Sequence, residues 1–148
     1  MRRKHGSAEI GMADISGMNA VWQQAIAKSS VQVNRELYES LQRGPLYDSN
    51  VLENARFAGT LAAKNTASIL PYCHTKHLTL IHIYFEWKVG SGVWELSIQA
   101  EIKAKHPSPV DTEAMLAASV AALSIYDSSK TISKSIVLGP TYLSRKGT

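Results

Sequence analysis

WELSIQAEIK, residues 94–103, alternates apolar and polar side chains without a break. This period of two is typical of a strand that turns one face to a core and the other to water. The preceding run, residues 77–88, is predicted to be its partner strand, because Val89-Gly90-Ser91-Gly92 between them has the composition of a turn. Together the two runs predict an antiparallel hairpin.

Two helices are predicted on the N-terminal side of this hairpin. Residues 51–69 carry apolar and small side chains at helical spacing. Asp48 or Ser49 can cap the start of this helix, and Pro71 stands just past its end. The second predicted helix is shorter, covers residues 35–43 and is closed by a Gly-Pro pair.

A third helix is predicted after the hairpin, beginning at Pro109 and including the alanine-lined run 112–130. Ser108 can cap it, Pro109 suits the first helical position, and Asp111 stands three residues after the cap as in a capping box. Small side chains on this helix allow a close approach to the sheet or to a second copy of the chain, although helix propensity alone explains them equally well. They are Ala114, Ala117, Ala118, Ala121 and Ala122.

Short strands predicted over residues 31–33 and 136–138 complete the order strand, helix, helix, strand, strand, helix, strand. Antiparallel strands covered on one face by helices predict an α+β fold with a ferredoxin-like sheet. A chain of 148 residues can form one domain with a real core and is too short for two ordinary domains. We expect a flexible tail over residues 1–11 and a single domain over residues 12–148.

Composition excludes several classes of protein. The net charge is +4, but no basic stripe interleaved with aromatic residues is present, so nucleic acid is not an expected partner. The single Cys73 cannot form an internal disulfide, and Cys73 and His74 are the only soft or borderline ligands that are adjacent in the sequence, so no metal is expected. No apolar run is long enough to span a membrane, and no hydrophobic segment follows the basic N-terminus. These features predict a cytoplasmic protein.

Asp127 and Lys130 lie three residues apart near the end of the third helix, so their side chains project from nearly the same face. Such pairs are common as surface ion pairs that contribute little to stability. The same spacing also allows an acid and a base to act together on one ligand. The spacing alone leaves both interpretations open.

Four segments provide a more specific signal: ARFAGTLAAK (55–64), ILPYCHT (69–75), DTEAMLAASVAALSIYDSSK (111–130) and LGPTYL (138–143). In this order and at these separations they resemble the motifs of cyclic pyranopterin monophosphate synthase, protein C of molybdenum cofactor biosynthesis. The resemblance extends from about Met12 to Lys146, nearly the whole chain. It implies a ferredoxin-like fold and an enzyme of the lyase type that needs no metal or redox cofactor.

The resemblance also implies roles for individual residues. Asp127 and Lys130 match the catalytic pair of the family, with Lys130 as the group that transfers protons and Asp127 as a base or an orienting carboxylate. An enclosed site would lower the pKa of Lys130 for this role. The residues that match substrate-binding positions are Tyr72, Cys73, His74, Thr112, Glu113 and Lys146.

The family builds its site at a dimer interface within a hexamer, so the resemblance implies a homo-oligomer. Lys146 is then expected to reach the Asp127 and Lys130 of a neighbouring copy. The family's substrate is a small molecule, a cyclised dihydroguanosine triphosphate, which is rearranged to a pyranopterin with a cyclic phosphate while pyrophosphate leaves. Proton transfers and cations that hold phosphate are sufficient for such a reaction.

The chain departs from the family pattern mainly at positions that would bind an anion. Asp48 replaces a lysine, Gln23 falls near an arginine, and Thr75 replaces a proline. The loop around residues 107–109 lacks a lysine and two glycines, the first of which is replaced by His106. If the family substrate is retained, another cation must compensate; the candidates are Arg56, Lys64 and Lys76.

These departures keep a second hypothesis open, in which the same Asp/Lys pair performs acid/base chemistry on a less anionic metabolite of a specialised biosynthetic pathway. A third hypothesis is a binding protein without catalytic activity.

Overall fold

A computed structural model describes residues 11–147 of the chain, with side chains described up to Ser144. Its strands form one sheet in the order β2-β3-β1-β4, with β5 also paired to β1, and every pairing is antiparallel. The strands are β1 (Val21–Val33), β2 (Leu78–Gly90), β3 (Val93–His106), β4 (Ile136–Leu138) and β5 (Tyr142–Gly147). This order is that of a ferredoxin-like sheet, so the predicted fold class is confirmed.

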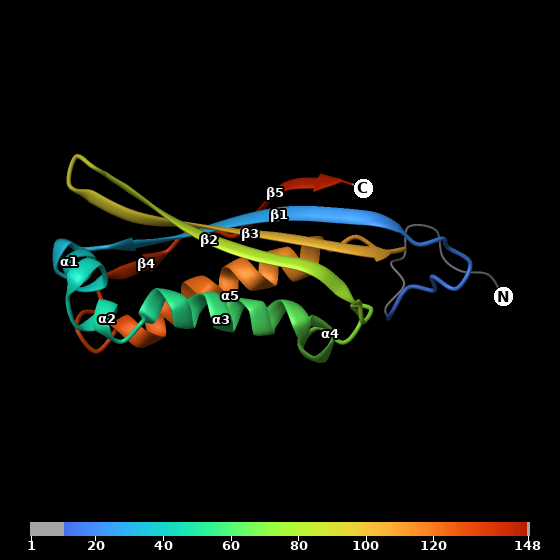
Figure 1. Ribbon diagram of the computed structural model, residues 1–148, viewed down its shortest axis with the longest axis horizontal. Coiled ribbons are helices and arrows are strands. Elements are labelled where there is room, and N and C mark those ends of the chain that lie inside the picture. The colour runs from blue at the N-terminus through green and yellow to red at the C-terminus, as the bar shows by residue number, and fades with distance from the viewer. Residues whose placement is uncertain (1–10, 148) are drawn as a thin grey trace.

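Helices cover one face of this sheet, and the two longest, α3 and α5, lie side by side against it (Figure 1). The helices are α1 (Arg35–Arg43), α2 (Pro45–Asp48), α3 (Val51–Lys64), α4 (Thr66–Ile69) and α5 (Asp111–Ser129). One cluster of buried side chains joins the sheet to the helices. Of the predicted N-terminal tail, only Gly11 lies within the described residues.

The predicted hairpin is present, and its turn is tighter than expected. Only Ser91 and Gly92 lie outside the strands, because Val89 and Gly90 still pair with β3. Both turn residues have positive φ angles, 50° at Ser91 and 78° at Gly92. A two-residue turn of this kind matches the right-handed twist of the strands, which explains the regular pairing that follows.

Strand β1 is longer than predicted, because it begins at Val21 and not at Val31. Its buried face carries Gln23, Ala25, Ala27 and Ser29 before the valines. These side chains are small or polar, so the hydrophobic alternation that would reveal a strand is weak over this part of the chain. The long β1 provides an edge on which β4 and then β5, which was not predicted, pair one after the other.

The predicted helix over residues 51–69 is interrupted, so that prediction is wrong at its C-terminal end. Asn65 separates α3 from α4 and its side-chain amide donates to Leu61 O at 2.8 Å, while the Thr66 hydroxyl contacts Ala62 O at 2.9 Å. Side chains that bond to helix carbonyls in this way compete with continued helix. The expected cap by Asp48 or Ser49 is also absent, because the cap position is Asn50 in a left-handed conformation with no side-chain cap bond.

Helix α5 begins at Asp111, two residues later than the predicted Pro109, and its cap residue Val110 makes no side-chain cap bond. The segment before it is held in another way. Gln23 Nε2 donates to His106 O at 3.0 Å, and the Ser108 backbone N–H donates to His106 Nδ1 at 2.9 Å. These contacts keep Ser108 out of the expected capping position.

The alanine stripe of α5 is buried within the chain, where it lets α3 and the sheet approach closely. Gly59 on α3 marks the closest approach, since a Cβ atom there would lie 2.8 Å from Ala117 O and 2.7 Å from Ile83 Cδ1. A side chain of any size therefore requires the two helices to move apart.

We expect Gly59→Ala to destabilise the fold by about 1–3 kcal/mol, because overpacking against a backbone oxygen outweighs the gain in helix propensity. The free energy of unfolding from urea denaturation at fixed protein concentration measures this effect. Gly90→Ala is the matched control, since a Cβ atom at Gly90 would have no other atom within 4 Å. Equal stability of the two variants would contradict the close packing.

Candidate active site

A pocket of about 440 Å³ lies where the loop after α4 meets the start of α5. Four of the predicted substrate-binding residues line it: Tyr72, Cys73, His74 and Thr112. A fifth, Glu113, contacts the Cys73 thiol, with Sγ 3.5 Å from Oε2. The fold thus brings five of these six residues together from segments about forty positions apart. The sixth, Lys146, pairs with Ala25 through its backbone, and its side chain lies outside the described part.

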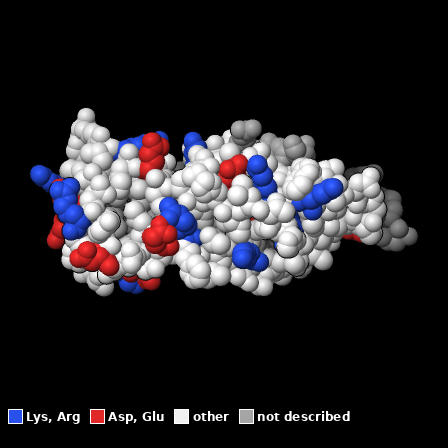
Figure 2. Space-filling view, viewed as in Figure 1, with Lys and Arg blue, Asp and Glu red and all other residues white. Residues whose placement is uncertain are grey.

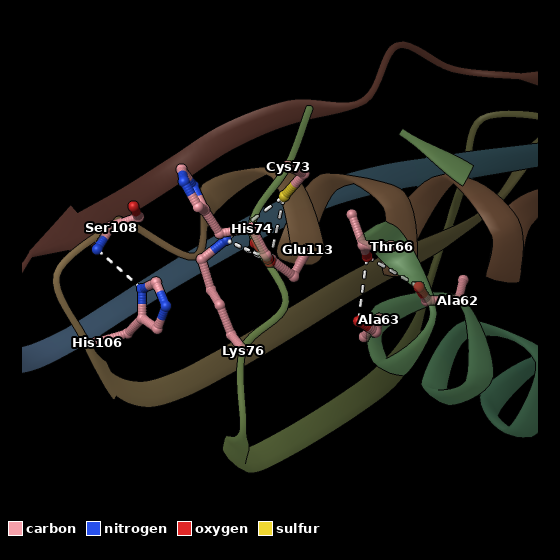
Figure 3. A network of polar contacts seen from close by, with 9 residues as sticks. All are labelled: Ala62, Ala63, Thr66, Cys73, His74, Lys76, His106, Ser108 and Glu113. Carbon is pink, nitrogen blue, oxygen red and sulfur yellow. Dashed lines mark hydrogen bonds and ion pairs between the residues drawn. The ribbon is translucent and has the colours of Figure 1, made fainter. Parts of the chain in front are cut away.

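A buried ion pair lies beside this pocket, between Lys76 and Glu113. Lys76 Nζ is 2.8 Å from Glu113 Oε2, and each side chain is only 3% exposed. The ammonium also donates to His74 O at 3.2 Å and to Cys73 Sγ at 3.4 Å. Figure 3 shows Cys73, Lys76 and Glu113 converging on one point. Glu113 lies in the first turn of α5, where the helix dipole also favours a carboxylate.

Two histidines lie close to this network. The rings of His74 and His106 are 6.4 Å apart, and His74 Nε2 lies 2.7 Å from Ala13 O. Burial, and then the charge of Lys76, lower the pKa of His106 below its usual value. His106 is therefore neutral at neutral pH, with Nδ1 accepting the backbone N–H of Ser108 (Figure 3).

Cys73 is held as a thiol. Burial, together with the carboxylate of Glu113, raises the pKa of its side chain above the usual value. The neutral S–H donates to Glu113, so Cys73 serves as a hydrogen-bonding group at neutral pH and not as a thiolate nucleophile.

The predicted catalytic pair lies at the opposite end of α5. Lys130 Nζ is 2.9 Å from Asp127 Oδ1, so the pair forms, but the side chains are 43% and 72% exposed. The hydrogen bond from Lys130 to Asp127, followed by the charge of Asp127, raises the pKa of Lys130. This direction is opposite to the lowered pKa expected, because no described part of the chain encloses the pair.

The two groups are far apart. Asp127 follows Glu113 by fourteen residues on one continuous helix, which corresponds to about 21 Å along its axis. Helix α2, which contains Asp48, lies at the same end of the molecule as the C-terminal end of α5 (Figure 1). The charge reversal at Asp48 therefore affects that end and not the pocket around Glu113.

None of the three candidate cations offers an unengaged charge to this pocket. Arg56 donates to Ile83 O at 2.9 Å, pairs with Glu53 and lies over the ring of Phe85. Lys76 is buried in the ion pair, and Lys64, exposed in the last turn of α3, is not among the residues that line the pocket. Figure 2 shows acidic and basic side chains interspersed on the face in view.

Two residues of this site are not assigned to it by the sequence. In the sequence, Lys76 is recognised only as a cation that could bind phosphate, and His106 is recognised only as part of a loop. The one signal for Lys76 is its position three residues after Cys73. Its partner Glu113 is 37 residues away, and no spacing rule connects the two.

Residues 11–147 contain no group of three or more His, Cys, Asp or Glu side chains arranged to hold a metal ion. Within the same range, no helix is both long and apolar enough to cross a membrane.

Known proteins resemble the chain over almost its whole length. It is 44% identical to cyclic pyranopterin monophosphate synthase of Halalkalibacterium halodurans over 135 residues, which cover 91% of this chain and 82% of that protein. The synthases of Geobacillus thermodenitrificans and Bacillus subtilis are 39% and 40% identical over 135 residues, again 91% of this chain, with 83% and 79% of those proteins covered. The profile of the MoaC family matches residues 12–148. The chain therefore belongs to the MoaC family.

Proposed function

We propose that this chain is a cyclic pyranopterin monophosphate synthase, a lyase that rearranges a cyclised dihydroguanosine triphosphate and releases pyrophosphate. The observation that carries the proposal is the sequence identity of 44% over 91% of the chain to a synthase of that name. The pocket formed by the matching segments 70–76 and 108–112 supports it, because the Cys73 thiol and the His74 ring line it while Glu113 and His106 lie close by, and such groups are suited to hold a polar ring system.

We propose further that the enzyme works as a homo-oligomer, built from dimers and expected to be a hexamer. The separation of about 21 Å between Glu113 and Asp127 supports this, because one small molecule cannot contact both groups of a single chain. A neighbouring copy would bring its Asp127 and Lys130 to the pocket. Lys146 would then contribute a further cation for the triphosphate. Enclosure by the neighbour is also what could lower the pKa of Lys130.

The direct test is turnover of the cyclised dihydroguanosine triphosphate by the purified full-length chain. We expect release of pyrophosphate and a product in which the remaining phosphate is cyclic, both detected by phosphorus NMR. The Lys130→Ala variant provides the background signal. Absence of pyrophosphate release by a folded, oligomeric sample would contradict the proposal.

Several expectations from the sequence stay predictions: a cytoplasmic location, no nucleic acid partner, and no metal or cofactor. A bound metal would be found by elemental analysis of the purified protein.

A further inference from the structure

The ammonium group of Lys76 is buried and uses all of its donors. It lies 2.8 Å from Glu113 Oε2, 3.2 Å from His74 O and 3.4 Å from Cys73 Sγ. An ammonium has three N–H donors, and these contacts account for all three. Lys76 therefore has no donor left for a phosphate, and its positive charge acts on Glu113.

Only one of the two carboxylate oxygens of Glu113 accepts hydrogen bonds from other described residues. Its Oε2 accepts from Lys76 and Cys73, while Oε1 is buried without a hydrogen-bond partner among the described residues. A buried carboxylate oxygen without a donor is unfavourable, and such a group calls for a ligand or an ordered water. Glu113 does not itself line the pocket, but Cys73 and Lys76, which contact it, do, so a bound molecule that shifts these side chains can present an N–H or O–H to this oxygen.

We propose that Lys76 is a positioning residue of the active site, whose ion pair with Glu113 holds that carboxylate turned so that Oε1 accepts a hydrogen bond from the substrate. This inference rests on the proposed function, because the substrate is that of the synthase reaction. The inference also indicates which part of the substrate the pocket binds. The pocket takes a hydrogen-bond donor of the ring system and not the phosphates, since a carboxylate repels an anion and Lys76 has no donor left for one.

Among the charged and titratable groups around Glu113, Lys76 is the main positive charge that stabilises its carboxylate. Cys73 and His74 come from the same loop as Lys76, His106 comes from the end of β3, and Asp111 lies on α5 itself. His106 is neutral at neutral pH, and Cys73 is a thiol. Without the ammonium, burial would favour the protonated form of the Glu113 carboxyl group.

The test compares full-length Lys76→Met with the wild type in the pH profile of kcat/KM for the cyclised nucleotide. We expect a loss of about tenfold or more at neutral pH, and an acidic limb shifted by about one pH unit or more to higher pH. Lys88→Met is the matched control, because Lys88 is exposed near the hairpin turn. An unshifted acidic limb in Lys76→Met would overturn the proposal.

A double variant tests whether Lys76 acts through Glu113. We expect Lys76→Met combined with Glu113→Gln to lose no more activity than Glu113→Gln alone. Additive losses would show an independent role for Lys76 and overturn the inference. Lys76→Arg keeps the charge and is expected to restore the wild-type acidic limb, which also gives an answer if Lys76→Met folds poorly.

The protonation state of Glu113 can be measured without turnover. Infrared spectra at neutral pH should show a protonated carboxyl band in Lys76→Met that is absent from the wild type and from the double variant. No such band in Lys76→Met would overturn the inference. If the wild type fails to convert the cyclised nucleotide, the proposed function fails, while this measurement still decides the role of Lys76.

Discussion

Replacing Lys130 with alanine should lower kcat/KM for the cyclised nucleotide at least about a thousandfold, the upper part of the range for a group that transfers a proton in the transition state. Asp127→Asn should lower it by about a hundredfold or more, because the amide keeps the shape and removes the charge that orients Lys130. Both values come from steady-state rates of pyrophosphate release. An active Lys130→Ala variant would remove the main catalytic assignment.

These variants should remain folded, since the Asp127 and Lys130 side chains are largely exposed and exposed ion pairs contribute little to stability. The matched control is Arg43→Ala, which breaks an exposed ion pair with Glu39 on α1 and should retain activity. Lys130→Arg separates charge from proton transfer. Arginine keeps the positive charge but does not release its proton, so we expect this variant to stay inactive.

Periodicity was sufficient to predict the frame of the fold. The alternation in residues 94–103 predicts most of β3, and the bounds predicted for the short helix over residues 35–43 are those of α1. In both segments most buried positions carry apolar side chains and most exposed positions carry polar ones, so the pattern of burial can be read from the sequence. Strand β1 does not follow this pattern, because its buried face is built from residues such as Gln23 and Ala25. The side chain of Gln23 donates to the carbonyls of residues 106 and 107. These are tertiary contacts, and no local sequence pattern predicts them.

The candidate site was predicted in its parts but not in its arrangement. The family motifs named Cys73, His74 and Glu113, and the fold brings these residues together. Lys76 could not be placed from the sequence, because its burial depends on a loop that packs against the first turn of α5. The motif of residues 111–130 also carries Glu113 and Asp127 in one segment, which hides the fact that a continuous helix holds them about 21 Å apart.

That separation leads to the second large effect we expect. If each active site combines the pocket of one copy with the Asp127 and Lys130 of another, two inactive variants should complement each other. Lys130→Ala damages one group and Glu113→Gln the other. Mixed dimers of the two variants contain one intact site and one doubly damaged site.

The experiment co-refolds the two variants in equal amounts from denaturant and measures pyrophosphate release. Random pairing makes half of the dimers mixed, each with one of two sites intact, so activity should rise to about a quarter of the wild-type value. The control mixes Lys130→Ala with Asp127→Asn, which damage the same group and should stay inactive together. If the first mixture shows only the sum of its separate activities while light scattering detects mixed oligomers, the two groups do not form a shared site between copies.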